Sequence, residues 1–188
     1  MFEWGETLPT LTGTRLQLRG LTDDDAAAIF EIFGDPEVMK YWSSPPLESL
    51  AAASALIEDI HRLAESRELF QWGIVSLESN VVIGTCTLQK VDHLHRRTEI
   101  GFALGRSAWG NGFATEAVGT LFEFAFQVLD LNRIEADVDP HNEASLRLLE
   151  RQGFRREGYL RERWFHLGEM QDTVLLGLLR RDWPGKRE

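Results

Sequence analysis

Hydrophobic and polar positions along the chain alternate between two periods, and this pattern predicts strands and helices in turn. Residues 15–19 alternate polar and apolar, as a half-buried strand does. Residues 22–33 have helical spacing, with Thr22 as the expected N-cap and three aspartates in the first turn. A short helical turn is expected within 35–42, and a longer amphipathic helix over 47–67.

The remaining pattern predicts a sheet with one parallel crossover. Residues 70–77 and 81–88, separated by three polar residues, predict a β-hairpin. Later strands are expected at 98–104, 133–138, 154–165 and 170–179, with helices at 112–129 and 143–152 and the last hairpin turning near 167–169. The unit from 98 to 138 should be parallel with a right-handed crossover. We find no repeat or linker, so we expect one α/β domain over 1–188, with tails at about 1–10 and 184–188.

Composition narrows the class of protein. The chain has 188 residues and a formal net charge of −10, which argues against a generic nucleic-acid binder. The negative charge is concentrated before Arg147; it could attract a cationic amine, although a solvated acidic surface is the simpler account. No run approaches the roughly 18 apolar residues that cross a bilayer, so we expect no membrane partner.

Cysteine and histidine content bears on compartment and metals. The start of the chain lacks a basic segment followed by an apolar run, so we expect no secretory signal. A single cysteine, Cys86, excludes an intramolecular disulfide and favours a reducing, cytoplasmic compartment. It lies in a strand-like run, where a small buried side chain is expected rather than a nucleophile. The histidines show no metal-ligand spacing, and His93 and His95 are expected in a surface turn, so we expect no metal.

Two turns follow successive strands and carry the candidate chemistry. In the first, Gly110 and Gly112 open a helix after strand 98–104. Amides at a helix start have no internal partner and suit a pyrophosphate, while a purely geometric role for the glycines is the alternative. The second turn contains Asn142 and Ser145, where helix capping is the simpler account of Asn142 and a polar first-turn position that of Ser145. Both turns lie at the carboxyl edge of the sheet, where ligands bind in α/β folds.

The order of these motifs resembles the GCN5-related N-acetyltransferase (GNAT) superfamily, and within it the ribosomal-protein N-terminal acetyltransferase-like (RimJ/RimL-type) branch. The segments that carry the resemblance are Glu99-Ile100-Gly101-Phe102, the glycine turn from Trp109 to Ala117, and Asn142–Ser145 leading to Gly153-Phe154. The resemblance implies a mixed six- to seven-stranded sheet flanked by helices, with central parallel strands that splay apart. A bulge-opened gap between those strands would admit a thioester.

The resemblance also implies acetyl-CoA as co-substrate and a primary amine as acceptor, either a small molecule or a protein N-terminus, and it leaves a homodimer open. Direct transfer in a ternary complex is the implied mechanism. The implied cofactor-binding residues are Phe102, Ala103 and Leu104 beside pantetheine, Gly110, Asn111, Gly112, Phe113, Ala114 and Thr115 around the pyrophosphate, and Asn142 and Ser145.

Two positions depart from the wider superfamily. Trp109 precedes the first glycine, as is often seen in this branch, and Leu149 stands where many members have a tyrosine acid. Ser145 is therefore our substitute, donating a hydrogen bond to the developing thiolate. Glu99 is the candidate base, since it shares a strand face with the small residues Gly101 and Ala103. The alternative for Glu99 is an exposed glutamate paired with Arg96 or Arg97.

Several further residues are weaker candidates. Glu162 and His166 are secondary candidates for the base, with a surface position as the simpler account of each. Arg106 and Arg151 are candidates for the CoA phosphates, although an exposed rim position explains them as well. Trp42, Trp72 and Trp164 are candidates for the acceptor cleft, with at least one expected in the core. A non-catalytic acyl-CoA sensor and a nucleotide-binding module are the competing functions.

Overall fold

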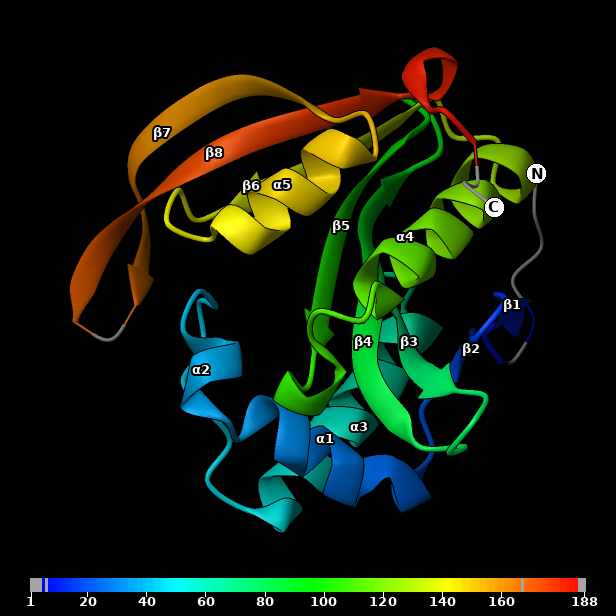
Figure 1. The fold of residues 1–188 in the computed structure, drawn as a ribbon, viewed down its shortest axis with the longest axis vertical. Coiled ribbons are helices and arrows are strands. Elements are labelled where there is room, and N and C mark those ends of the chain that lie inside the picture. The colour runs from blue at the N-terminus through cyan, green and yellow to red at the C-terminus, as the bar shows by residue number, and fades with distance from the viewer. Residues whose placement is uncertain (1–4, 6, 167, 186–188) are drawn as a thin grey trace.

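The computed structural model describes residues 5, 7–166 and 168–185, and a mixed β-sheet runs through its centre (Figure 1). The described strands are β1 (Leu11–Thr12), β2 (Leu16–Gly20), β3 (Leu69–Ser76), β4 (Val82–Asp92), β5 (Arg97–Leu104), β6 (Arg133–Val138), β7 (Arg155–His166) and β8 (Glu169–Leu179). Their order across the sheet is β1-β2-β3-β4-β5-β6-β8-β7. Among these described strands, only β5 and β6 pair in parallel, as expected for a crossover.

The described sheet has eight strands, so the expected count of six to seven was wrong. The strand beyond the seven expected from the pattern, β1, is two residues long and pairs with β2 through Leu11 and Thr12. Two residues cannot show a hydrophobic alternation, which is why the sequence pattern missed this strand. The segment before it also packs, because Leu8 lies against the core and the Pro9 carbonyl accepts from Trp72 Nε1 at 2.9 Å.

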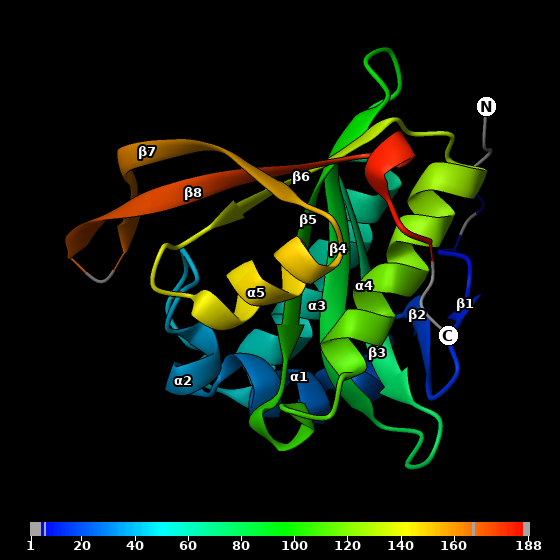
Figure 2. The same ribbon diagram turned by 45° about the horizontal axis from the view of Figure 1, so that its top comes forward.

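Helices cover both faces of the sheet (Figure 2). On one face lie α1 (Ala26–Phe33), α2 (Pro36–Met39) and α3 (Leu50–Glu65), and on the other α4 (Phe113–Glu123) and α5 (Glu143–Arg151). A 3-10 turn at Asp23–Asp25 precedes α1, two more lie at Arg106–Ala108 and Arg180–Asp182, and α4 continues as a π-helical turn at Phe124–Val128. The expected helices are therefore confirmed, with ends that differ by a few residues. The helix expected from 47 begins at Leu50 because Ser49 caps it, accepting from the Ala52 N–H at 3.1 Å.

Two apolar cores hold these layers together, one on each face. The larger core joins α4 and α5 to the sheet and includes Ile100 and Leu104 of β5. The smaller core joins α1 and α3 to the sheet and includes Ala103. This division confirms the expected alternation along β5, and it places Glu99 on the α1–α3 face, with Ala103. Cys86 is fully buried in the larger core, and burial raises the pKa of its thiol, which confirms a packing role.

The central parallel pair separates soon after it starts. Pairing of β5 with β6 runs from Arg97↔Arg133 to Glu99↔Glu135, and no further pairs follow in the described strands. The pairing of β5 with β4, in contrast, continues to Leu104. The expected gap between the two parallel strands is therefore present. The register irregularity beside it lies in β4, between Gln89 and Asp92, and not between the parallel strands.

The last hairpin extends beyond the rest of the sheet as an arm (Figures 1 and 2). Strand β8 pairs with β6 only from Leu179 to Val174, so residues 169–173 pair with β7 alone. The turn was expected near 167–169; Gly168 and Glu169 lie there, and Leu167 is outside the described residues. His93 and His95 lie in an exposed turn, as expected. None of the described helices is long and apolar enough to cross a membrane.

Candidate functional site

The glycine turn has a backbone that requires glycine at two positions. Gly110 has φ +74° and Gly112 has φ +78°, both in the left-handed region that disfavours other residues. Gly112 is the N-cap of α4, and the first helical bond runs from the Glu116 N–H to the Gly112 carbonyl at 3.1 Å. The amides of 113–115 precede that bond and lie at the positive end of the helix dipole. This geometry fits a pyrophosphate.

Arg15 braces the turn from the neighbouring strand end. Its Nη1 donates to the Asn111 carbonyl at 3.0 Å, and its guanidinium lies 4.8 Å from the centre of the Phe113 ring. Its Nε donates to Glu116 at 2.9 Å. With half of its side chain exposed, Arg15 adds a positive charge beside the amides. The sequence pattern gave Arg15 only a place in a strand, because its partners lie about 100 residues away.

A cavity of about 380 Å³ lies where β5 and β6 separate. Its lining residues come from the segment after α2, from β4, β5, β6 and its following turn, from α5, and from the β7–β8 arm: Tyr41, Trp42, Ser43, Gln89, Lys90, Glu99, Ile100, Gly101, Phe102, Ala136, Asp137, Val138, Asp139, Asn142, Ser145, Leu149, Trp164, Gln171 and Asp172. Residues from both faces of the sheet take part, so the cavity connects the two faces through the gap.

On the α4–α5 side, the cavity wall is mostly uncharged. Phe102 and Leu149 pack in or against the larger core, and Asn142 and Ser145 come from the start of α5. Asn142 Oδ1 accepts from the Ser145 N–H at 3.1 Å, so the capping account of Asn142 is confirmed while its side chain also reaches the cavity. The structure thus brings Phe102, Asn142 and Ser145 together.

On the α1–α3 side, Glu99 lines the cavity with only 18% of its side chain exposed. It accepts from Gln89 Nε2 at 2.6 Å and from Lys90 Nζ at 2.7 Å. The expected alternative, an exposed glutamate paired with Arg96 or Arg97, was wrong. Those arginines lie at the start of β5 and pair with other carboxylates, among them Glu135 and Asp130.

Three aspartates give the same cavity a negative charge. Asp137 accepts from neutral donors, Thr173 Oγ1 and Trp164 Nε1, the latter at 3.2 Å. Asp172 accepts from the Tyr159 hydroxyl and from a backbone N–H, and these hydrogen bonds lower its pKa. Asp139, with a side chain that is 9% exposed, accepts from the His141 N–H and lies 3.0 Å from the His141 imidazole. Lys90 is the one lysine or arginine among the described lining residues.

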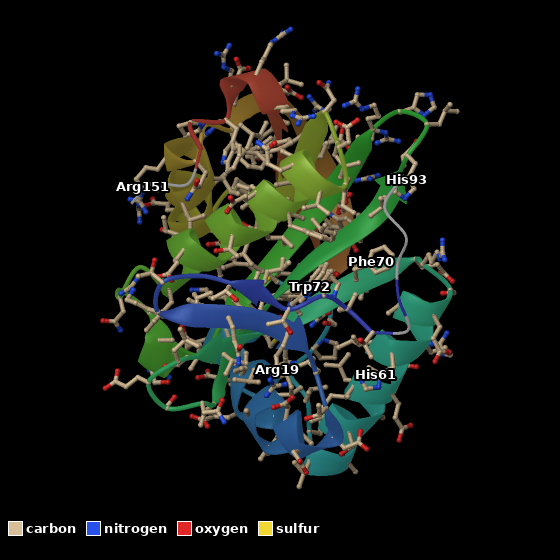
Figure 3. All side chains as sticks on the ribbon, turned by 90° about the vertical axis from the view of Figure 1, so that its right-hand side faces the viewer. Arg19, His61, Phe70, Trp72, His93 and Arg151 are labelled. Carbon is tan, nitrogen blue, oxygen red and sulfur yellow. The ribbon has the colours of Figure 1, made fainter. Side chains whose placement is uncertain are left out.

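Other predicted residues lie outside the cavity. Trp72 (labelled in Figure 3) is fully buried in the core and was a wrong candidate for the acceptor cleft. The other two candidates, Trp42 and Trp164, do line the cavity. Arg151 is exposed at the periphery (Figure 3), and Arg106 lies 3.6 Å from Asp35. Glu162 is exposed, as expected. His166 is buried, so the surface position expected for it was wrong.

The cofactor residues expected along β5 divide between the two faces. Phe102 lines the cavity, whereas Ala103 packs in the smaller core and the Leu104 side chain in the larger core. The Leu104 carbonyl accepts from Trp109 Nε1 at 2.7 Å, so this tryptophan ties the glycine turn to the end of β5.

Several lining residues were missed by the sequence pattern: Tyr41, Ser43, Gln89, Lys90, Asp137, Gln171 and Asp172. One signal was available for Asp137. It alternates with the buried Ala136 and Val138 at the carboxyl end of a parallel strand, which is where ligands bind. Gln89 and Lys90 lie on β4, beside Glu99 in the sheet, while the other missed residues come from the arm and from the segment after α2, which only the fold brings to the gap.

The split parallel pair, the glycine turn at the start of α4 and the cavity in the split together are features of an acyl-CoA-dependent transferase. The chain belongs to the acetyltransferase (GNAT) family, whose model matches residues 15–155. It is an acetyl-CoA-dependent N-acetyltransferase by that membership, and the resemblance seen in the sequence is confirmed.

Comparisons with individual proteins agree. A Bacillus licheniformis protein named uncharacterized N-acetyltransferase p20 is 38% identical, covering 95% of this chain and 100% of that protein. The structure of spermidine N-acetyltransferase from Vibrio cholerae in complex with CoA and spermine has a TM-score of 0.79 at 26% identity, over 89% of this chain and 97% of that one. Mycobacterium smegmatis RimJ in complex with CoA-disulfide has a TM-score of 0.85 at 24% identity, over 95% and 90%, and supports the RimJ-like fold.

Proposed function

We propose that this enzyme transfers acetyl from acetyl-CoA directly to a small cationic primary amine, with Glu99 as base and Ser145 as donor to the leaving sulfur. The observation that carries the proposal is the cavity through the β5–β6 gap, which Phe102 and Leu149 line on the α4–α5 face and the carboxylates of Glu99 and Asp137 line on the α1–α3 face. Such a channel lets thioester and amine meet from opposite sides of the sheet.

Acetyl-CoA fits the α4–α5 side. The amides of 113–115 and the Arg15 guanidinium would hold the pyrophosphate, and the unpaired edge of β5 beyond Glu99 would face pantetheine. A backbone N–H of that edge, within 102–104, would polarise the thioester carbonyl. The glycine turn lacks both the lysine of a Walker loop and the three-glycine spacing of a dinucleotide site. The nucleotide-binding alternative therefore has no support.

The chemistry is a single displacement. The neutral amine nitrogen attacks the thioester carbonyl carbon, the carbon–sulfur bond breaks, and the amine proton passes to Glu99 directly or through one water. The leaving thiolate accepts a hydrogen bond from the Ser145 hydroxyl; because a thiol has a pKa of about 8.5, full protonation is not required. The Gln89 and Lys90 donors fix the position of the Glu99 carboxylate.

The acceptor side favours a cation over a neutral peptide end. On this side Asp137 accepts hydrogen bonds from neutral donors, Trp164 Nε1 and Thr173 Oγ1, and pairs with no lysine or arginine within 4 Å in the described ranges, so a positively charged ligand would supply its counter-charge. The Vibrio cholerae relative, solved with spermine, is named for such a polyamine substrate. A protein N-terminus, the other acceptor considered, also has a free amine, but it need not have a second cationic group near that amine.

The test is an acceptor panel read by mass spectrometry and by thiol release. We compare 1,5-diaminopentane and spermidine with pentylamine and with short peptides that have free N-termini. The proposal predicts acetylation of the diamines with at least tenfold higher kcat/KM than pentylamine, and an Asp137→Asn variant that loses most of this preference. If the enzyme prefers the peptides, the acceptor is a protein N-terminus and not a small amine. If the protein binds CoA but no amine stimulates thiol release from acetyl-CoA, it is a sensor and not an enzyme.

We also propose that residues 1–188 act as one catalytic domain in the cytoplasm. The single buried cysteine supports a reducing compartment.

A further inference from the structure

The β7–β8 arm contains a large bulge next to the cavity. Leu160 pairs with Thr173 and Trp164 pairs with Gln171, so residues 161–163 of β7 stand opposite Asp172 alone. Bulges of this kind bend a strand and re-aim its side chains, and they are frequent beside active sites. Here Glu162 adopts φ +52°, a left-handed conformation that costs a non-glycine residue free energy.

The bulge decides which side chain faces the acceptor side of the cavity. If the register of Leu160↔Thr173 continued without interruption, Gln171 would stand opposite Glu162. The two extra residues place Trp164 there instead. A position that would present a carboxylate therefore presents an indole, which lines the cavity with 38% of its surface exposed.

Asp172 holds this bulge in place. Its Oδ1 accepts from the backbone N–H of Glu162, the residue with the strained backbone, at 2.8 Å. Its other oxygen accepts from the Tyr159 hydroxyl. The register partner of Tyr159 is Val174, which packs in the larger core, so Tyr159 lies on the α4–α5 face of the arm. Asp172, two positions before Val174 on the same strand, lies on that face as well. Asp172 thus fixes the bulge from the face opposite to the indole.

Trp164 is fixed from the cavity side as well. Its Nε1 donates to Asp137 Oδ1 at 3.2 Å, which bridges the arm to the end of β6, where β6 still pairs with β8 but no longer with β5. The Arg163 guanidinium lies 5.4 Å from the centre of the indole. Trp42, packed against the smaller core, lines the same cavity.

We propose that Trp164 is a specificity-determining residue for the acceptor amine, and that Asp172 is a positioning residue that places it through the bulge. This inference rests on the proposed function. Trp164 supplies an aromatic face that excludes water from the acceptor chain and attracts its cationic group. Asp172 contributes through the backbone of Glu162, not through the reaction.

The test compares Asp172→Ala, Asp172→Asn, Trp164→Ala and Trp164→Phe with Glu169→Ala, an exposed carboxylate variant on the same strand beyond the bulge. We expect Asp172→Ala and Trp164→Ala to raise the KM for the diamine about tenfold, with kcat and the Kd for CoA changed less than twofold. Asp172→Asn keeps an oxygen for the Glu162 N–H and Trp164→Phe keeps an aromatic face, so each should recover most of the loss. Glu169→Ala should match the wild type.

A second readout does not depend on activity. The indole N–H resonance of Trp164, assigned by its loss in Trp164→Phe, should shift or broaden in Asp172→Ala and stay near its wild-type position in Asp172→Asn and Glu169→Ala. An unchanged resonance in Asp172→Ala overturns the positioning role. A wild-type diamine KM in Trp164→Ala overturns the specificity role. If the wild type acetylates no amine, the proposed function fails, while the resonance still decides whether Asp172 places the indole.

Discussion

Arg15 and Glu116, about 100 positions apart in the chain, are joined by the Arg15 Nε and by backbone N–H groups that donate to the same carboxylate. The Arg15 Nε–Glu116 Oε2 distance is 2.9 Å, and the N–H groups of Thr14 and Arg15 each lie 2.7 Å from Oε1. This contact fastens the segment before β2 to the first turn of α4. It fixes the helix start on which the pyrophosphate site depends.

The Glu116 contact should make stability depend on pH in acid. Burial alone would raise the pKa of Glu116, but the hydrogen bonds from Arg15 and Thr14 outweigh it and hold the pKa below its ordinary value. A lowered folded-state pKa contributes stability above the unfolded pKa of about 4.3, and this contribution is lost as pH falls through the folded value. Glu116→Gln should therefore cost about 1–2 kcal/mol at pH 7 and much less near pH 3. Urea unfolding at both pH values checks this, and an equal cost at both would contradict it.

The glycine turn should weaken cofactor binding when Gly112 becomes alanine. A residue with a Cβ at φ +78° costs about 1–2 kcal/mol in this conformation, so the turn relaxes and its amides lose their common direction. We expect the KM for acetyl-CoA to rise about tenfold, equivalent to ~1.4 kcal/mol, with little change in the KM for the amine. Gly168→Ala is the matched control, since Gly168 has φ +88° and open space around it but lies in the arm. Equal effects of both variants on the acetyl-CoA KM would mean that the loss reflects general strain.

The base assignment predicts a slow variant that still binds. Glu99→Gln keeps the shape of the side chain and one of the two oxygens that accept from Gln89 and Lys90, but it removes the proton acceptor. Turnover should fall about 10²-fold, and the part of the pH–rate profile due to Glu99 should disappear. The Kd for CoA should not change. Kinetics and a pH profile like those of the wild type would remove Glu99 from the reaction.

The role of Ser145 predicts a smaller loss that depends on the leaving group. Ser145→Ala keeps the backbone N–H that Asn142 caps, so α5 should be unaffected. Loss of one hydrogen bond to the developing thiolate should lower kcat about tenfold. With an acetyl thioester of a more acidic thiol, the difference from the wild type should shrink. A difference that stays constant across leaving groups would assign Ser145 to binding alone.

Most strands and helices could be predicted from the sequence because burial of one face imposes a regular spacing of hydrophobic residues on each of them. The alternation of Ile100 and Leu104 against Glu99 and Ala103, for example, places these residues on opposite faces in the structure as expected. The glycine turn and the start of α5 were equally accessible, since positive φ and capping select particular residue types.

The acceptor half of the site could not be obtained in the same way. Trp164 reaches the cavity only through a bulge held by Asp172, and no local period encodes a change of register. The partners of Arg15 and Glu99 likewise depend on contacts between distant segments. Trp72, in contrast, shares one face of β3 with the buried residues Phe70 and Ile74, so the alternation along its own strand was enough to predict its burial.

The most direct test of the whole account is a crystal structure with CoA. We predict the diphosphate on the amides of 113–115 with the Arg15 guanidinium beside it, and the CoA sulfur in the gap beyond the Glu99↔Glu135 pair, near Ser145. A cofactor bound elsewhere, or a gap closed by side chains when CoA is present, would contradict the site and the mechanism built on it.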